Sequence, residues 1–160
     1  MAANSNDSLQ QSPIEPIIDC VCDALVASLL ETGQAHYKID CGILPGDKDE
    51  VLVALHLGTK FSFRVSRKAI RACHRLRVTE TTKPLQKVAI HLHNALVNCV
   101  CTTGHAQFEI ESELINREKG ISRVRLLLGT TYSITLSRKE IAGSNSLRHS
   151  EGAQPYRLGL

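Results

Sequence analysis

The sequence predicts an α+β fold, built as a tandem duplication of one α-β-β-β-α unit with a period of 71 residues. Three observations predict it. Residues 57–70 and 128–141 share eight of their fourteen positions at that offset. In both halves, apolar residues recur at helical spacing and then alternate as in strands. The chain of 160 residues is 42% hydrophobic and 22% charged, which suits about one globular domain with a buried core.

The duplication rests on the segments LGTKFSFRVSRKAI and LGTTYSITLSRKEI. The same offset pairs Pro13 with Pro84 and Gly33 with Gly104, without a gap. At least 21 of 71 aligned columns are identical, whereas ordinary composition gives about four or five. We therefore expect a first unit at 13–83 and a second at 84–149, packed as one compact domain. The ends, 1–11 and 150–160, are expected to be disordered.

Each unit is expected to open with a long helix. Ser12-Pro13-Ile14-Glu15 is typical of a capped helix start, and Lys83-Pro84-Leu85-Gln86 is its weaker copy. Gly33 and Gly104 provide the stops. Each expected helix has one apolar stripe along its length. The stripe residues are Ile14, Ile17, Ile18, Val21, Cys22, Leu25 and Leu29 in the first helix and Leu85, Val88, Leu92, Leu96 and Cys99 in the second.

Three strands should follow each helix, because apolar and polar residues alternate there. In the first unit the apolar positions are Tyr37, Ile39, Cys41 and Ile43, then Val51, Val53, Leu55 and Leu57, then Phe61, Phe63 and Val65. The second unit repeats this with Phe108, Ile110 and Leu114, then Val124, Leu126 and Leu128, then Tyr132, Ile134 and Leu136. This period indicates antiparallel sheets with one buried and one wet face.

Ser66 and Ser137 are placed as N-caps of a closing helix. We expect a helix over 66–77 with Ile70, Cys73 and Leu76 inward, and a shorter or frayed copy over 137–148. A lone three-stranded sheet buries little. The two units should therefore join as a six-stranded sheet with both long helices on one face, around a pseudo-two-fold axis. Two separate domains are the alternative, disfavoured by the short linker at 79–83.

The net charge is +3 and the pI is about 8.6, but the basic residues are unevenly distributed. No acid interrupts residues 60–77, and such a cluster can neutralise several phosphates. The candidate nucleic-acid-binding residues are Lys60, Arg64, Arg67, Lys68, Arg71, Arg75 and Arg77. A solvated charged face is the alternative. Ala142 and Ser146 replace Arg71 and Arg75 in the second unit, so only one unit is expected to carry the site.

The α-β-β-β-α order, with Ser66-Arg67-Lys68 opening the last helix, resembles the double-stranded RNA-binding domain. That family opens its final helix with a serine and two basic residues directed at phosphates. The resemblance covers about twelve residues and the element order, without the glycines that precede the serine in the family. It implies a non-enzymatic protein that binds nucleic acid, RNA in particular, through the phosphate backbone.

The wet face of the sheet gives a second hypothesis. A loop at 116–120 sets Glu113 opposite Arg123 and Glu111 opposite Arg125, which is typical of an exposed charge ladder. The matching face of the first unit is less charged and carries Leu52, Ala54 and His56, with Leu127 from the second unit. These residues favour the alternative function, a protein-interaction module such as a dimeric chaperone or adaptor that binds a protein client.

No catalytic residue, metal site or cofactor is expected. His91, His93, Cys99, Cys101 and His105 are of types that suit zinc. On a helix, however, residues i and i+2 point about 200° apart, so only a cross-helix site with Cys20 and Cys22 stays open. Phosphate-loop, nucleophile-elbow and zinc-protease motifs are missing from the sequence.

The compartment is expected to be the cytoplasm. No apolar run approaches the roughly 20 residues that a membrane span needs. The residues MAANSNDSLQQSP lack the basic and apolar regions of a secretory signal. We therefore interpret the six cysteines as reduced thiols, and expect no membrane partner.

Overall fold

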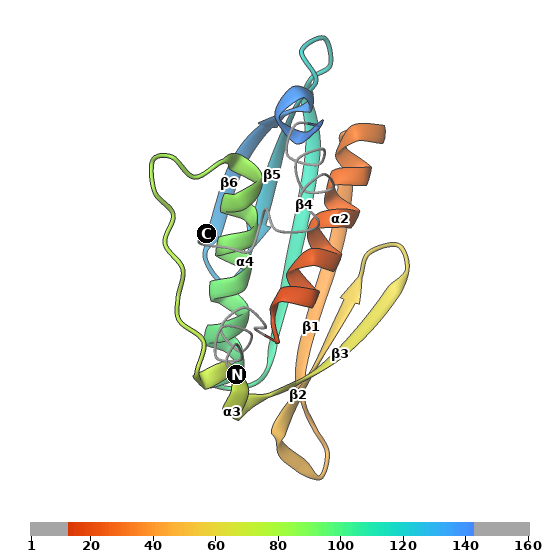
Figure 1. Ribbon diagram of the computed structural model, residues 1–160. Helices are drawn as coiled ribbons and strands as arrows, with labels where there is room; N and C mark the ends of the chain where they lie inside the picture. Colours follow the sequence, from red (N-terminus) through yellow and green to blue (C-terminus); the bar gives the residue numbers. More distant parts are fainter. Residues whose placement is uncertain (1–12, 143–160) are drawn as a thin grey trace, which may run out of the picture.

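The computed structural model describes residues 13–142 and has the predicted α+β class. Its elements in chain order are α2 (Glu15–Glu31), β1 (Ala35–Leu44), β2 (Asp47–His56), β3 (Lys60–Ser66), α3 (Arg67–Arg71), α4 (Pro84–Cys101), β4 (Ala106–Asn116), β5 (Ile121–Leu127) and β6 (Thr131–Ser137). All six strands form one antiparallel sheet in the order β3-β2-β1-β4-β5-β6. Helices α2 and α4 lie side by side on one face of it (Figure 1). The predicted six-stranded sheet is confirmed.

The long helices begin and end close to the predicted signals. At the start of α4, the Lys83 backbone N–H donates to Gln86 Oε1 at 3.3 Å, as the capping pattern predicts. Helix α2 begins at Glu15, because residues 13–14 form a turn, and the predicted cap Ser12 lies outside the described residues. Both helices end just before a glycine with positive φ, +79° at Gly33 and +76° at Gly104.

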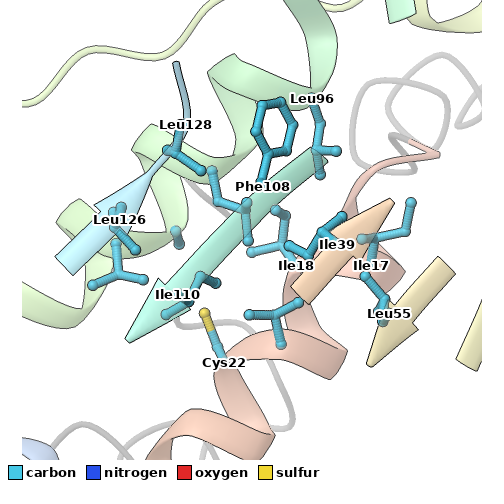
Figure 2. Close-up of a cluster of buried hydrophobic side chains, with 14 of the residues drawn as sticks. Ile17, Ile18, Cys22, Ile39, Leu55, Leu96, Phe108, Ile110, Leu126 and Leu128 are labelled. Atoms are coloured by element: carbon cyan, nitrogen blue, oxygen red, sulfur yellow. The ribbon is translucent and has the colours of Figure 1, made fainter. Parts of the chain in front are cut away.

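The hydrophobic core lies between the two helices and the sheet. The predicted apolar stripes of α2 and α4 are buried, as are most of the alternating positions of β1, β2, β4 and β5. Ile43 and Leu114 are only half-buried, and the expected burial of Phe61 on the edge strand β3 is wrong, because this side chain is exposed. Figure 2 shows that side chains from both halves of the chain meet in this layer, with Ile18 near Ile39 and Cys22 near Ile110. Neither half therefore has a separate core.

The central contact of the sheet is the pairing of β1 with β4. It runs from Ala35 opposite Ser112 to Cys41 opposite Ala106, with Lys38 opposite Glu109 in the middle. This pairing joins the first half of the chain to the second through backbone hydrogen bonds. The two halves consequently share one sheet instead of meeting through side chains alone.

The two helix-ending glycines pack against the opposite half. A Cβ on Gly33 would lie 2.9 Å from Leu114 Cδ1 and 3.1 Å from Ser122 Oγ. A Cβ on Gly104 would lie 2.7 Å from Ile43 Cγ1. Each glycine thus allows a close approach between a helix end of one half and a strand of the other.

The predicted closing helix over 66–77 is wrong in its extent. Helix α3 covers only Arg67–Arg71, and residues 73–79 are irregular. The cause is Asn94 on α4, whose Oδ1 accepts from the Leu76 N–H at 2.8 Å and whose Nδ2 donates to the Leu76 carbonyl at 2.8 Å. These bonds occupy the backbone N–H and carbonyl of Leu76, which a continuing helix would need for its own hydrogen bonds. In the second half, residues 138–142 are helical and 143–148 lie outside the described residues.

We predict that Gly104→Ala destabilises the protein more than Gly46→Ala does. Both glycines have positive φ, +76° and +84°, so both substitutions strain the backbone by about 1 kcal/mol. Only Gly104 has a neighbour within 3.0 Å of the added Cβ, whereas Gly46 has none within 4 Å. Urea unfolding should give an extra loss of about 1–3 kcal/mol for Gly104→Ala. Equal losses would show that the close contact between the halves is unimportant.

Candidate nucleic-acid interface

The seven predicted basic residues lie on three consecutive pieces of chain. Lys60 and Arg64 point to the same side of β3, about 13 Å apart by strand geometry. Arg67, Lys68 and Arg71 belong to α3, and the last two residues belong to the segment that leads to α4. This chain runs along one edge of the sheet, turns at α3 and passes beside α4 (Figure 1). Six of the seven are exposed, and we call them the basic track: Lys60, Arg64, Lys68, Arg71, Arg75 and Arg77.

Arg67, the seventh residue, is bound to backbone carbonyls. Its Nε donates to the Val100 carbonyl at 3.0 Å and its Nη2 to the Thr102 carbonyl at 2.8 Å. Nη1 also donates to the Lys48 carbonyl at 3.4 Å. The C-terminus of α4 has carbonyls without helical partners and a partial negative charge, both of which a guanidinium satisfies. In the free protein, Arg67 therefore fastens α3 to the end of α4.

The start of α3 is closed by a carboxylate from β2. Ser66 Oγ accepts from the Ala69 N–H at 3.3 Å, as its predicted N-cap role requires, and donates to Asp49 Oδ2 at 2.8 Å. The Lys68 N–H donates to Asp49 Oδ1 at 3.2 Å. The Ser66 hydroxyl, the Lys68 N–H and the nearby charges of Lys68 and Arg71 hold the pKa of Asp49 below its usual value. The expected anion site at this helix start is thus taken by the protein's own carboxylate.

The segment after α3 lies against α4 and carries Arg75 to a cavity. Asn94 fixes this segment through the Leu76 backbone. The cavity has a volume of about 200 Å³ and is lined by Arg75, His91, Asn98 and Thr130 among others. The ring of His91 stacks on Tyr132, with centroids 3.8 Å apart and planes at 19°. Burial and the charge of Lys87 lower the pKa of His91, so this histidine stays neutral to lower pH than usual.

Acidic groups near the basic track are few among the described ion pairs. Arg64 Nη1 lies 3.9 Å from Glu50 Oε1, with 70% of the arginine side chain exposed.

The helical residues 138–142 begin with a different set of hydrogen bonds. The Ser137 N–H donates to Glu140 Oε1 at 2.9 Å, and the Glu140 N–H donates to Ser137 Oγ at 3.1 Å. Glu140 stands 71 positions after Ala69 in the sequence, so this helix start has a carboxylate three residues after its serine, whereas α3 has an alanine.

The charge ladder predicted on the uncovered face has the predicted register. Glu113 is opposite Arg123 and Glu111 is opposite Arg125. Arg125 Nη1 lies 3.2 Å from Glu111 Oε1. In the first half, His56 Nε2 lies 3.0 Å from Asp40 Oδ2. Of the apolar residues on this face, Ala54 is buried, whereas Leu52 and Leu127 are half-buried.

Of the histidines and cysteines considered for zinc, His91, His93 and Cys99 contact other side chains. His91 stacks on Tyr132, and His93 is buried beside Asn94 with Nδ1 3.4 Å from Oδ1. Cys99 is buried within hydrogen-bonding reach of the Cys41 thiol. In residues 13–142, the possible metal-ligand atoms that lie within 4.8 Å of one another belong instead to His36, Glu109 and Glu111. Sequence reasoning missed it, because only the β1–β4 register brings residues so far apart in the chain together.

We predict that Arg67→Ala lowers the free energy of unfolding by about 2 kcal/mol, because the carbonyls at the end of α4 lose a charged donor. Arg71→Ala is the matched control, since Arg71 is an exposed cation on the same helix, and it should change stability by less than about 0.5 kcal/mol. Urea unfolding followed by circular dichroism measures both. A loss no greater for Arg67→Ala than for Arg71→Ala would contradict the anchoring role.

Comparisons of the chain with known proteins identify no family. Neither a protein-family model, nor a curated protein, nor a solved structure matches the chain. In the described part of the chain, no helix combines the length and apolar character needed to cross a bilayer.

Proposed function

We propose that the protein is a non-enzymatic binding protein for nucleic acid, RNA in particular, and that phosphates lie along the basic track. The observation that carries the proposal is the exposure of six cations along one path of chain, from β3 over α3 to the side of α4. Such a row can neutralise successive phosphates of one strand. An isolated surface cation contributes little by comparison.

Three properties of the basic track support a polyanion as the ligand. The cations are spread over a length that a single small anion cannot span, since Lys60 and Arg64 alone are about 13 Å apart. Four of the six are arginines, and two of the six, Lys68 and Arg71, lie on α3. Arg67 fixes the backbone of α3 against α4. The cavity beside Arg75 adds neutral polar groups, the Asn98 amide and the Thr130 hydroxyl, that can donate to phosphate oxygens.

The roles within the predicted set divide in two. Lys60, Arg64, Lys68, Arg71, Arg75 and Arg77 are the proposed phosphate contacts, while Arg67 holds α3 in place. The resemblance to double-stranded RNA-binding domains assigns phosphate contact to the start of the last helix. Here Asp49 occupies that start, so the contacts are proposed for the side chains that follow it.

We also infer that the two halves, 13–83 and 84–149, arose by tandem duplication around a pseudo-two-fold axis. The contacts of Gly33 with Leu114 and of Gly104 with Ile43 support this, because the offset of 71 residues exchanges them. The turns support it as well: the Leu57 N–H donates to the Thr59 carbonyl and the Leu128 N–H to the Thr130 carbonyl, both at 3.0 Å. On this inference, the second copy lost the cations equivalent to Arg71 and Arg75.

The alternative function is a protein-interaction module that uses the uncovered sheet face. The half-buried Leu52 and Leu127 on that face favour it, since apolar side chains there can pack against a client or a second copy. Light scattering after size exclusion separates the two functions. A tight dimer free of nucleic acid favours the interaction module, whereas a monomer that copurifies with RNA favours the basic track.

We further propose a reducing, cytoplasm-like compartment. All six cysteines are free thiols, and Cys22, Cys41 and Cys99 are buried in the apolar core as small hydrophobic residues.

We predict that the double variant Arg71→Ala with Arg75→Ser weakens RNA binding at least tenfold at about 0.1 M salt. These substitutions place in the first half the residues that stand at the equivalent positions of the second, Ala142 and Ser146. The slope of log K against log salt should shrink by about 1.5–2, because two phosphate contacts are lost. Fluorescence anisotropy with labelled single-stranded and duplex RNA measures both quantities.

The control removes two exposed cations that lie outside the basic track, Arg117→Ala with Lys119→Ala, from the turn between β4 and β5. It should change affinity less than twofold. Equal effects of the two double variants, or binding that ignores ionic strength, would contradict the proposed site.

A further inference from the structure

The β1–β4 pairing gathers three metal-ligating side chains on the uncovered face of the sheet. His36 is directly opposite Glu111, and Glu109 is two residues before Glu111 on the same face of β4. His36 belongs to the first half of the chain and both glutamates to the second. Of the described residues, these three have one ligand atom each, all within 4.8 Å of one another.

The distances suit a small divalent ion. His36 Nε2 lies 2.9 Å from Glu109 Oε1 and 3.9 Å from Glu111 Oε2. Zinc binds nitrogen and oxygen ligands at about 2.0–2.2 Å, so the ligand atoms of a tetrahedral site are about 3.3–3.6 Å apart. The two observed separations bracket that range. Small rotations of exposed side chains can therefore equalise them around an ion.

The neighbouring residues prepare both carboxylates to act as ligands. Arg125 binds Oε1 of Glu111 at 3.2 Å, which leaves Oε2 directed toward His36. Such an outer hydrogen bond orients a ligand without occupying its donor atom. On the other carboxylate, Glu109 Oε1 lies 2.9 Å from His36 Nε2, so this oxygen is also directed toward the imidazole.

A cavity of about 280 Å³ adjoins the cluster and is lined by His36, Glu111, Glu113 and Arg125 among others. Three protein ligands leave a tetrahedral ion with one open position, and this cavity gives water or a small anion access to it. An imidazole in the ligand set favours zinc and similar transition metals over calcium or magnesium, which prefer oxygen ligands alone.

We propose that His36 Nε2, Glu109 Oε1 and Glu111 Oε2 bind one divalent transition-metal ion, with zinc as the representative, and that Arg125 positions Glu111. In the metal-free protein, His36 Nε2 and Glu109 Oε1 form a hydrogen bond. When the ion binds, this hydrogen bond is broken and each of the two atoms forms a bond to the metal instead. The site is independent of the basic track, since the two sets share no residue.

The chain provides a matched control on the same face. His56 Nε2 lies 3.0 Å from Asp40 Oδ2, so it forms a similar histidine–carboxylate pair. In the described residues, that pair belongs to no three-ligand cluster. The side chains of His36 and His56 are 55% and 41% exposed, so replacing either with alanine should leave the fold intact.

The test is a zinc chloride titration of the full chain by isothermal calorimetry, with circular dichroism as the folding check. The wild type and His56→Ala should bind zinc alike, whereas His36→Ala and Glu109→Gln should weaken one site at least tenfold. Zinc bound by the six thiols is common to all four proteins and cancels in this comparison. Histidine ring resonances followed by NMR should shift for His36 and not for His56. Unchanged binding by His36→Ala, or equal responses of the two rings, would overturn the proposal.

Discussion

The antiparallel pairing of β1 with β4 is the interaction on which the rest of the structure depends. Without it, each half would be a three-stranded sheet with one helix, an open edge and too little buried area to be stable alone. With it, α2 and α4 meet over a continuous sheet, and residues such as Ile39 and Ile110 become fully buried. Gly33 and Gly104 lack side chains where a helix end of one half packs against a strand of the other, so no Cβ meets Leu114 or Ile43 there.

The β1–β4 pairing also determines where the charged side chains lie on the surface. Because β1 and β4 are central, β3 lies at an edge and its outward side chains begin the basic track. Arg67 then ties α3, from the first half, to the C-terminus of α4, from the second. On the uncovered face, the β1–β4 register places His36 beside Glu109 and Glu111. The His36 cluster therefore contains residues of both halves, whereas the cations of the basic track all belong to the first half and are positioned through contacts with α4 of the second.

Much of the fold could be predicted from local patterns, because alternation, helical spacing and helix-ending glycines act within a few residues. The short loop between β4 and β5 was enough to predict that Glu111 faces Arg125. The length of α3 could not be predicted, because Asn94, on a different helix, binds the backbone N–H and carbonyl of Leu76. The anchoring role of Arg67 and the His36 cluster could not be predicted either. Both depend on which strands pair at the centre of the sheet, and a two-fold arrangement alone does not determine that.

Hydrogen exchange across a urea series tests the shared core most directly. If both halves depend on the β1–β4 junction, peptides from α2 and β1 should lose protection at the same urea concentration as peptides from α4 and β4, in one cooperative transition. Loss of protection in one half, while the other half stays protected at higher urea concentration, would show that the halves fold independently and would contradict the account.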